Sequence, residues 1–256
     1  QIQGPKSKAL MKDLLGDQVD LDNMPFYGLA EVKVAGRSCV ISQSGFSGEA
    51  GYEIYLRDAT LHADDMWNAV LDAGKKHNLM VIAPAHHRRI QAGILSWGQD
   101  MDQQHNPFQC NLGYQVSLSG KGEWNKVGNY IGKDVLEQMR SELKSGKKPY
   151  KLQLVGLKMG GKPIEDFAND FWLISADDFA EPCGFITSPW FHPDEKTNIA
   201  MAYVPFDGTL NRHGFPIGNY GQKFKVHLPD KYAEKAGEPV NADVVKMLFT
   251  TSVNLN

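Results

Sequence analysis

Residues 44–53 read Ser-Gly-Phe-Ser-Gly-Glu-Ala-Gly-Tyr-Glu and carry more information about the fold than any other stretch of the chain. Three glycines allow tight turns and a close approach of other groups, because no Cβ stands in the way. Glu49 and Glu53 lie near the aromatic residues Phe46 and Tyr52. A carboxylate beside an aromatic wall suits a planar heterocycle with adjacent N–H donors. A glycine-rich hairpin with solvated glutamates is the plainer alternative, and local chemistry leaves both open.

The composition is that of a globular protein. The 256 residues are 42% hydrophobic and 22% charged, enough for one large or two ordinary domains. A net charge of −3 without a basic block argues against nucleic-acid binding. No apolar run approaches the length of a membrane span, and the three cysteines are too few and too widely spaced for a disulfide scaffold. We therefore expect a cytoplasmic protein with neither a nucleic-acid nor a membrane partner.

Residues 1–95 contain segments with the periodicity of helices and segments with the periodicity of strands. Apolar residues recur at helical spacing over 6–15 and 61–77, and residues 85–95 also read as a helix. Residues 31–42 predict two short strands joined at Ala35-Gly36, and residues 52–56 predict another. This order predicts an α+β fold with helices on one face of an antiparallel sheet.

The pattern changes near residue 150. The polar stretch 141–149 reads as a linker, so we place a domain boundary between residues 146 and 147. Beyond it, short strands separated by turn residues predict a small closed β-barrel or a sandwich, with the aromatic residues 189–192 in a loop. The expected strands are 152–157, 184–187, 199–204, 223–228 and 243–247.

Four ordered segments of the chain carry a recognisable pattern. They are the glycine-rich signature at 42–53, the Gln-Gly-Pro turn at 3–7, the Arg-x-x-Ala-Gly…Trp-Gly-x-Asp-x-Asp run at 89–102 and the Tyr-Ile-Gly-Lys-x-x-Leu junction at 130–136. Together they resemble the glycine-cleavage T-protein (aminomethyltransferase) superfamily. The resemblance implies an aminomethyltransferase-like folate-binding region over residues 1–146, followed by a C-terminal antiparallel β-barrel over 147–256. One departure is Gln91, which stands where the family usually has Glu.

A further departure concerns what precedes residues 3–7. Family members carry a long segment before this turn, including an aspartate that contacts the reactive part of the folate. We therefore expect the N-terminal part of the family fold to be absent, as in a fragment, a processed chain or one piece of a split protein. The missing portion would then be a separate or cleaved partner chain, and the catalytic residues stay unassigned.

The resemblance implies tetrahydrofolate as the cofactor. Glu53 stands at the family's folate-recognising glutamate, and a carboxylate matches the adjacent N–H donors of a pterin. Phe46 falls where the family often has an aromatic beside the pterin, although a core phenylalanine is equally expected. Glu49 is a weaker candidate, because it can instead organise the loop through backbone amides.

Arg89 is the best cationic candidate, although a structural salt bridge is nearly as plausible and helix phase allows only one of Arg88 and Arg89 to point inward. Trp97 offers a large flat face for stacking, although a tryptophan in a core is the commoner situation. For Asp100 and Asp102 we expect pairing with backbone amides and no metal, because two carboxylates without further ligands make a poor site.

The resemblance further implies a tetrahydrofolate-dependent methyltransferase, most similar to demethylases that take a one-carbon group from a small methylated donor. Residues 93–118 are similar to dimethylsulfoniopropionate demethylase, and residues 1–5 to vanillate and syringate O-demethylases, which act on methoxyaromatic acids. One alternative is the aminomethyltransferase of glycine cleavage, which takes its group from a lipoyl partner. Another is a non-catalytic folate-binding module, against which residues 128–132 count because they lack the cysteine of that group's motif.

Overall fold

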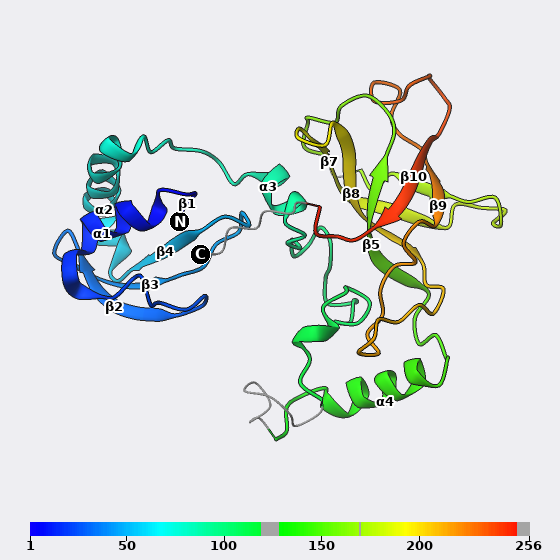
Figure 1. Cartoon of the computed structure of the whole chain (residues 1–256), viewed down its shortest axis with the longest axis horizontal. Helices are drawn as coiled ribbons and strands as arrows, with labels where there is room; N and C mark the ends of the chain where they lie inside the picture. The colour runs from blue at the N-terminus through cyan, green and yellow to red at the C-terminus, as the bar shows by residue number, and fades with distance from the viewer. Residues whose placement is uncertain (119–127, 169, 250–256) are drawn as a thin grey trace. The chain divides into compact units, whose positions relative to one another are not determined.

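The computed structural model describes residues 1–118, 128–168 and 170–249, which form two compact units, Gln1–Ile94 and Leu95–Phe249 (Figure 1). Residues 95–146 belong to the same unit as the strands that follow them. The domain boundary at 146/147 stays a prediction, and the end of the predicted domain 147–256 lies outside the described residues.

The first unit is built on a four-stranded antiparallel sheet with the order β1-β4-β3-β2. The hairpin between β2 and β3 turns at Ala35 and Gly36, both with positive φ, as the sequence predicts. The strands are β1 (Ile2–Gln3), β2 (Leu29–Val34), β3 (Arg37–Ser42) and β4 (Gly51–Leu56); the helices are α1 (Ser7–Leu15), α2 (Ala59–Gly74) and α3 (His86–Gln91), with short 3₁₀ turns at Gly16–Gln18 and Lys75–His77.

Helices α1 and α2 cover one face of this sheet, as predicted (Figure 1). Leu10 and Met11 of α1 and Met66 of α2 pack with Val34 and Ile41 of the strands in one apolar core. Because side chains alternate along a strand, β4 has its apolar residues in this core and its polar residues on the opposite face. The uncovered face is therefore where β4 can present polar groups.

Helix α3 is shorter than the predicted helix 85–95. It ends at Gln91, and Gly93 then takes a φ of 71°, a conformation that terminates helices and that glycine adopts without strain. The amide of Ile94 donates to the carbonyl of Arg89, which closes the helix end.

The second unit contains α4 (Lys133–Lys144), a 3₁₀ turn at Gly113–Gln115 and a closed barrel with the strand order β10-β5-β8-β7-β6-β9 (Figure 1). A closed barrel leaves no free sheet edge, and the alternative of an open sandwich is wrong. Its strands are β5 (Leu152–Met159), β6 (Leu173–Ser175), β7 (Gly184–His192), β8 (Thr197–Pro205), β9 (Lys223–Val226) and β10 (Val240–Val245).

In this unit two sequence expectations need correction, and one strand was missed. Residues 189–192 form the end of β7 rather than a loop, because they pair in register with β8. The first part of the predicted linker 141–149 is helical, since α4 continues to Lys144. Strand β6 was not predicted, because three residues are too few for a recognisable alternation.

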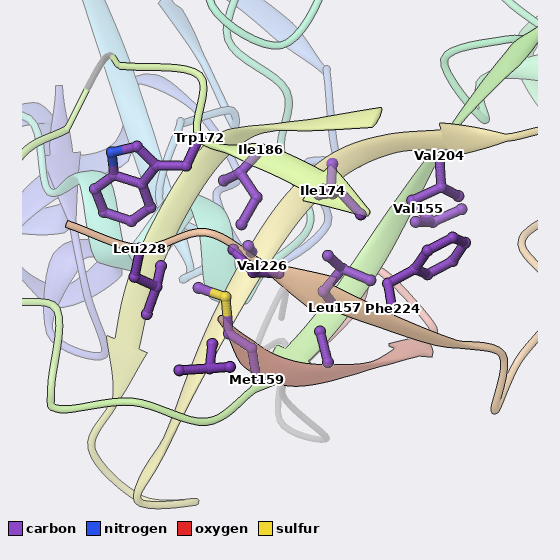
Figure 2. Packing of buried hydrophobic residues seen from close by; sticks show 14 of the residues in the cluster. Val155, Leu157, Met159, Trp172, Ile174, Ile186, Val204, Phe224, Val226 and Leu228 are labelled. Carbon is purple, nitrogen blue, oxygen red and sulfur yellow. The ribbon is translucent and has the colours of Figure 1, made fainter. Parts of the chain in front are cut away.

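The barrel interior is filled by alternate residues of its strands. Figure 2 shows these side chains converging from different strands on one core, and aliphatic burial of this kind contributes about 1.5–3 kcal/mol per side chain. Across the described residues, every helix falls short of the length and apolarity that a membrane span requires. The labelled core residues are Val155, Leu157, Met159, Trp172, Ile174, Ile186, Val204, Phe224, Val226 and Leu228.

Candidate functional site

The carboxylate of Glu53 projects from the uncovered face of β4 and is half-buried. Two hydroxyls donate to its Oε2 atom: Ser44 Oγ at 2.5 Å and Tyr55 Oη at 2.9 Å. The hydrogen bond to Glu53 raises the pKa of Tyr55, so the phenol stays a neutral donor. The loop and the strand therefore hold one oxygen of Glu53 in place from two sides.

The other carboxylate oxygen of Glu53, Oε1, differs from Oε2 in its hydrogen bonding. Among residues 1–118, 128–168 and 170–249, Oε1 of Glu53 has no hydrogen-bond partner. A carboxylate oxygen has two lone pairs, so Oε2 is saturated by its hydroxyls whereas Oε1 can accept hydrogen bonds from a ligand. A ring edge with two donors therefore finds one open oxygen, and its second donor reaches Oε2 only by displacing a hydroxyl.

Gln3 anchors the loop that leads to Glu53. Its Nε2 donates to the carbonyl of Ser44 at 3.1 Å, and its Oε1 accepts from Ser47 Oγ at 2.6 Å. A Cβ on either Gly45 or Gly51 would lie 2.1 Å from the Gln3 amide. These glycines were expected to make room for a ligand, and that expectation is wrong for them, because they make room for the chain's own glutamine.

Gly48 packs against Ala92 and not against Gln3. It has a φ of 73°, and a Cβ there would lie 2.4 Å from the Cβ of Ala92. The tight turn thus brings the glycine-rich signature against the segment that follows α3. Glu49, in the same turn, forms an ion pair with the exposed Arg88 at 3.3 Å, and its amide donates to Ser47 Oγ. Glu49 therefore contributes to the organisation of the loop.

Arg89 is fully buried, so helix phase points this arginine inward and leaves Arg88 outside. Its Nη1 donates to the carbonyl of Ile94 at 3.1 Å, and its Nη2 lies 3.0 Å from Nε2 of His86. These contacts hold the end of α3 and the residues after it. A direct role of Arg89 in ligand binding stays a prediction.

The two predicted aromatic residues lie in different units. Phe46 is 38% exposed in the glycine-rich loop of the first unit. Trp97 is 68% exposed in the second unit, where it lines a pocket of about 340 Å³ together with Met101, Asp102 and His105. The structure thus gathers Glu53, Phe46, Glu49 and Arg89 in one unit and Trp97 in the other.

Asp100 and Asp102 pair with backbone amides, as predicted: Oδ2 of Asp100 accepts from Ser96 and Oδ1 of Asp102 from Gln104, each at 2.8 Å. Asp100 lies in a turn and is buried, whereas Asp102 is half-exposed. Thr187 and other barrel residues also form hydrogen bonds with Asp100.

The sequence missed Gln3, Ser44 and Tyr55 as supports of Glu53. Side chains alternate along β4, which places Tyr55 on the same face as Glu53. The sequence therefore contained enough information to predict Tyr55 as a partner of Glu53. The position of Gln3 depends on the pairing of β1 with β4, in which Gln3 lies opposite Gly51. Local periodicity contains no information about that pairing.

Residues 1–120 match the family model described as the GCVT N-terminal domain. The aminomethyltransferase of Caldanaerobacter subterraneus subsp. tengcongensis is 31% identical over 206 residues, which are 79% of this chain and 49% of the relative. The aminomethyltransferase of Symbiobacterium thermophilum is 30% identical over 209 residues, 80% of this chain and 50% of the relative. The chain spans about half the length of the curated relatives it matches.

A solved structure has the same fold. The glycine cleavage system aminomethyltransferase T from Bartonella henselae matches with a TM-score of 0.69 at 20% sequence identity, over 97% of this chain and 58% of that one. This likeness confirms the predicted aminomethyltransferase-like α+β fold with its C-terminal antiparallel barrel.

Proposed function

Because the chain belongs to the glycine-cleavage T-protein superfamily, we propose that it functions as part of a tetrahydrofolate-dependent transferase of one-carbon groups. The matching relatives are named aminomethyltransferases, which supports aminomethyl transfer over the demethylation that the sequence motifs favour. A demethylase acting on a small methylated donor is the second candidate, favoured by the resemblance of residues 93–118 to such enzymes.

The open Oε1 atom of Glu53 carries this proposal. Ser44 and Tyr55 fix the carboxylate through Oε2, so Oε1 is held ready for an N–H donor on a planar ring. Tetrahydrofolate fits this chemistry, since its reduced pterin has an amino group and a ring N–H on one edge, and it supplies the nitrogen that accepts the one-carbon group. The half-exposed Phe46 provides an apolar side chain in the same loop.

The contribution of these residues is binding and orientation. A carboxylate fixed by two hydroxyls and a loop fixed by Gln3 need little rearrangement when a single N–H donor of a ligand binds Oε1 of Glu53. Alignment of donor and acceptor can lower a group-transfer barrier by about 7–11 kcal/mol. The rigidity of the Gln3-anchored loop is therefore a functional property under this proposal.

Calorimetry with tetrahydrofolate tests the proposal directly. We compare the chain with Glu53→Gln, which keeps the shape of the side chain but removes its charge. A hydrogen bond to a charged group contributes about 1.5–3 kcal/mol, so binding should weaken about 10- to 150-fold. Glu31→Gln is the matched control, because Glu31 is an exposed glutamate on β2 of the same sheet. Absence of binding, or equal affinity in Glu53→Gln, would contradict the proposal.

Product analysis separates the two candidate reactions. Mass spectrometry should detect 5,10-methylenetetrahydrofolate when an aminomethyl donor carried on a lipoyl group is supplied. Formation of 5-methyltetrahydrofolate from dimethylsulfoniopropionate or vanillate would instead identify a demethylase.

A further inference from the structure

The hydroxyl of Tyr55 occupies a position on Glu53 that a ligand with paired donors needs. It donates to Oε2 of Glu53 at 2.9 Å, and Ser44 Oγ donates to the same atom at 2.5 Å. A carboxylate oxygen has two lone pairs, so these two hydroxyls fill Oε2. A planar edge with two adjacent N–H donors binds a carboxylate through both oxygens, one donor to each. One hydroxyl must therefore leave Oε2 before such an edge can bind both oxygens of Glu53.

Ser44 is held in place on Oε2. It is 7% exposed, and its carbonyl accepts from Nε2 of Gln3 at 3.1 Å, which fixes its backbone. If the Ser44 hydroxyl lost Oε2, a buried donor would be left without an acceptor, and an unpaired buried donor costs its full desolvation. Its bond to Oε2 is also the shorter of the two. Ser44 is therefore the permanent partner of Glu53.

Tyr55 is free to leave. It is 54% exposed on β4, so its released hydroxyl passes into water and its donor stays satisfied. The half-buried Val40 of β3 lies directly opposite Tyr55, and paired residues of neighbouring strands share a face. The ring thus keeps an apolar neighbour on the sheet. Exposed side chains change rotamer within nanoseconds, so this movement is fast beside ligand binding.

We propose that Tyr55 is a latch that competes with the ligand for Oε2 of Glu53. In the empty site its hydroxyl holds the carboxylate, and the second donor of the ligand displaces it. Because the bond to Tyr55 is broken as the bond to the ligand forms, the latch lowers the affinity for a paired-donor edge and speeds its release. A ligand with a single donor binds Oε1 and leaves Tyr55 in place. This inference rests on the proposed folate function and concerns the regulation of that same site.

Calorimetry on Tyr55→Phe with two ligands tests the latch. Tetrahydrofolate has the paired donors, and its 2-desamino analogue keeps the ring N–H but lacks the amino group. Removal of the competing hydroxyl is worth about one net hydrogen bond, so Tyr55→Phe should bind tetrahydrofolate about 2- to 10-fold more tightly than the parent chain. Its affinity for the 2-desamino analogue should stay unchanged.

Tyr27→Phe is the matched control. Tyr27 is 67% exposed in the same unit, and it makes no hydrogen bond to Glu53 within the part of the chain that the structure describes. This variant should bind both ligands as the parent chain does. Tighter binding of tetrahydrofolate by Tyr27→Phe, equal to that of Tyr55→Phe, would overturn the proposal.

NMR of the parent chain with isotope-labelled tyrosine observes the latch itself. The Cζ signal of Tyr55, assigned by its loss in Tyr55→Phe, should move to the position of a water-exposed phenol when tetrahydrofolate saturates the site. With the 2-desamino analogue it should keep the position that it has in the empty protein. A signal that responds equally to both ligands would contradict the displacement.

The outcomes also separate this inference from the proposed function. Equal or weaker binding of tetrahydrofolate by Tyr55→Phe, beside a loss of binding in Glu53→Gln, would overturn the latch and leave folate recognition by Glu53 intact. Equal tightening of both ligands would overturn the competition for Oε2. Absence of tetrahydrofolate binding in the parent chain and in Tyr55→Phe would overturn the latch together with the proposed function.

Discussion

Replacing Gly51 with alanine should destabilise the first unit through a collision with Gln3. The new Cβ would lie 2.1 Å from Nε2 of Gln3, a distance that real Cβ atoms do not show, so the glutamine amide must move. Gly51 does not have a positive φ, and alanine is therefore compatible with the local backbone. The cost of the substitution comes from the displaced amide.

The displaced amide makes three hydrogen bonds. Gln3 Nε2 donates to the carbonyls of Ile2 at 3.2 Å and Ser44 at 3.1 Å, and Gln3 Oε1 accepts from Ser47 at 2.6 Å. Each bond contributes about 1 kcal/mol net, so Gly51→Ala should lower the free energy of unfolding by about 3 kcal/mol.

A double-mutant cycle isolates this mechanism. In a Gln3→Ala background the space is free, and Gly51→Ala should cost little or even stabilise by about 0.4–1 kcal/mol, because alanine restricts the unfolded chain. Urea unfolding at 25 °C, followed by circular dichroism, measures all four proteins. A neutral Gly51→Ala, or a cost that persists unchanged in the Gln3→Ala background, would refute the assigned role of Gln3.

Two further predictions concern carboxylates away from Glu53. Asp100→Asn should lower the free energy of unfolding by about 1.5–3 kcal/mol in urea titrations, because the buried Oδ1 of Asp100 accepts from Thr187 at 2.6 Å and Ser188 at 2.5 Å. For Asp13, hydrogen bonds from His77 first and then Lys76 lower the pKa. A lowered folded-state pKa stabilises above the unfolded value of about 4, and this stabilisation is lost as pH falls through the folded-state pKa. Asp13→Asn should therefore reduce the loss of thermal stability below about pH 4, and an unchanged acid limb of the stability profile would contradict this.

The sequence predicted those parts of the fold that depend on local signals. The β2–β3 hairpin follows from alternation on either side of Ala35 and Gly36, and most barrel strands follow from short apolar runs between turns. Strand β6 was not predicted from the sequence because it is so short. The end of α3 was misplaced because the pattern of apolar residues continues past Gly93, whose backbone conformation terminates the helix.

Fewer features of the candidate site could be predicted. The orientation of Glu53 follows from alternation along β4, but its two hydroxyl partners are known only from the structure. The contiguous motif at 89–102 contains both Arg89 and Trp97, and the two compact units divide within it, between Ile94 and Leu95. A run of sequence that matches one family motif can thus contribute to two separately packed bodies.

The glycines of residues 44–53 show why a motif's composition and its function must be tested separately. Gln3 accounts for Gly45 and Gly51, and Ala92 accounts for Gly48, so all three glycines have structural partners within the first unit. The glycine spacing alone therefore requires no ligand. Evidence for folate binding must come from the Oε1 atom of Glu53, which the internal packing leaves without a partner among the described residues. Glu53→Gln should lower folate affinity without the loss of stability expected of Gly51→Ala, and this difference would separate the group that the loop presents from the scaffold of the loop.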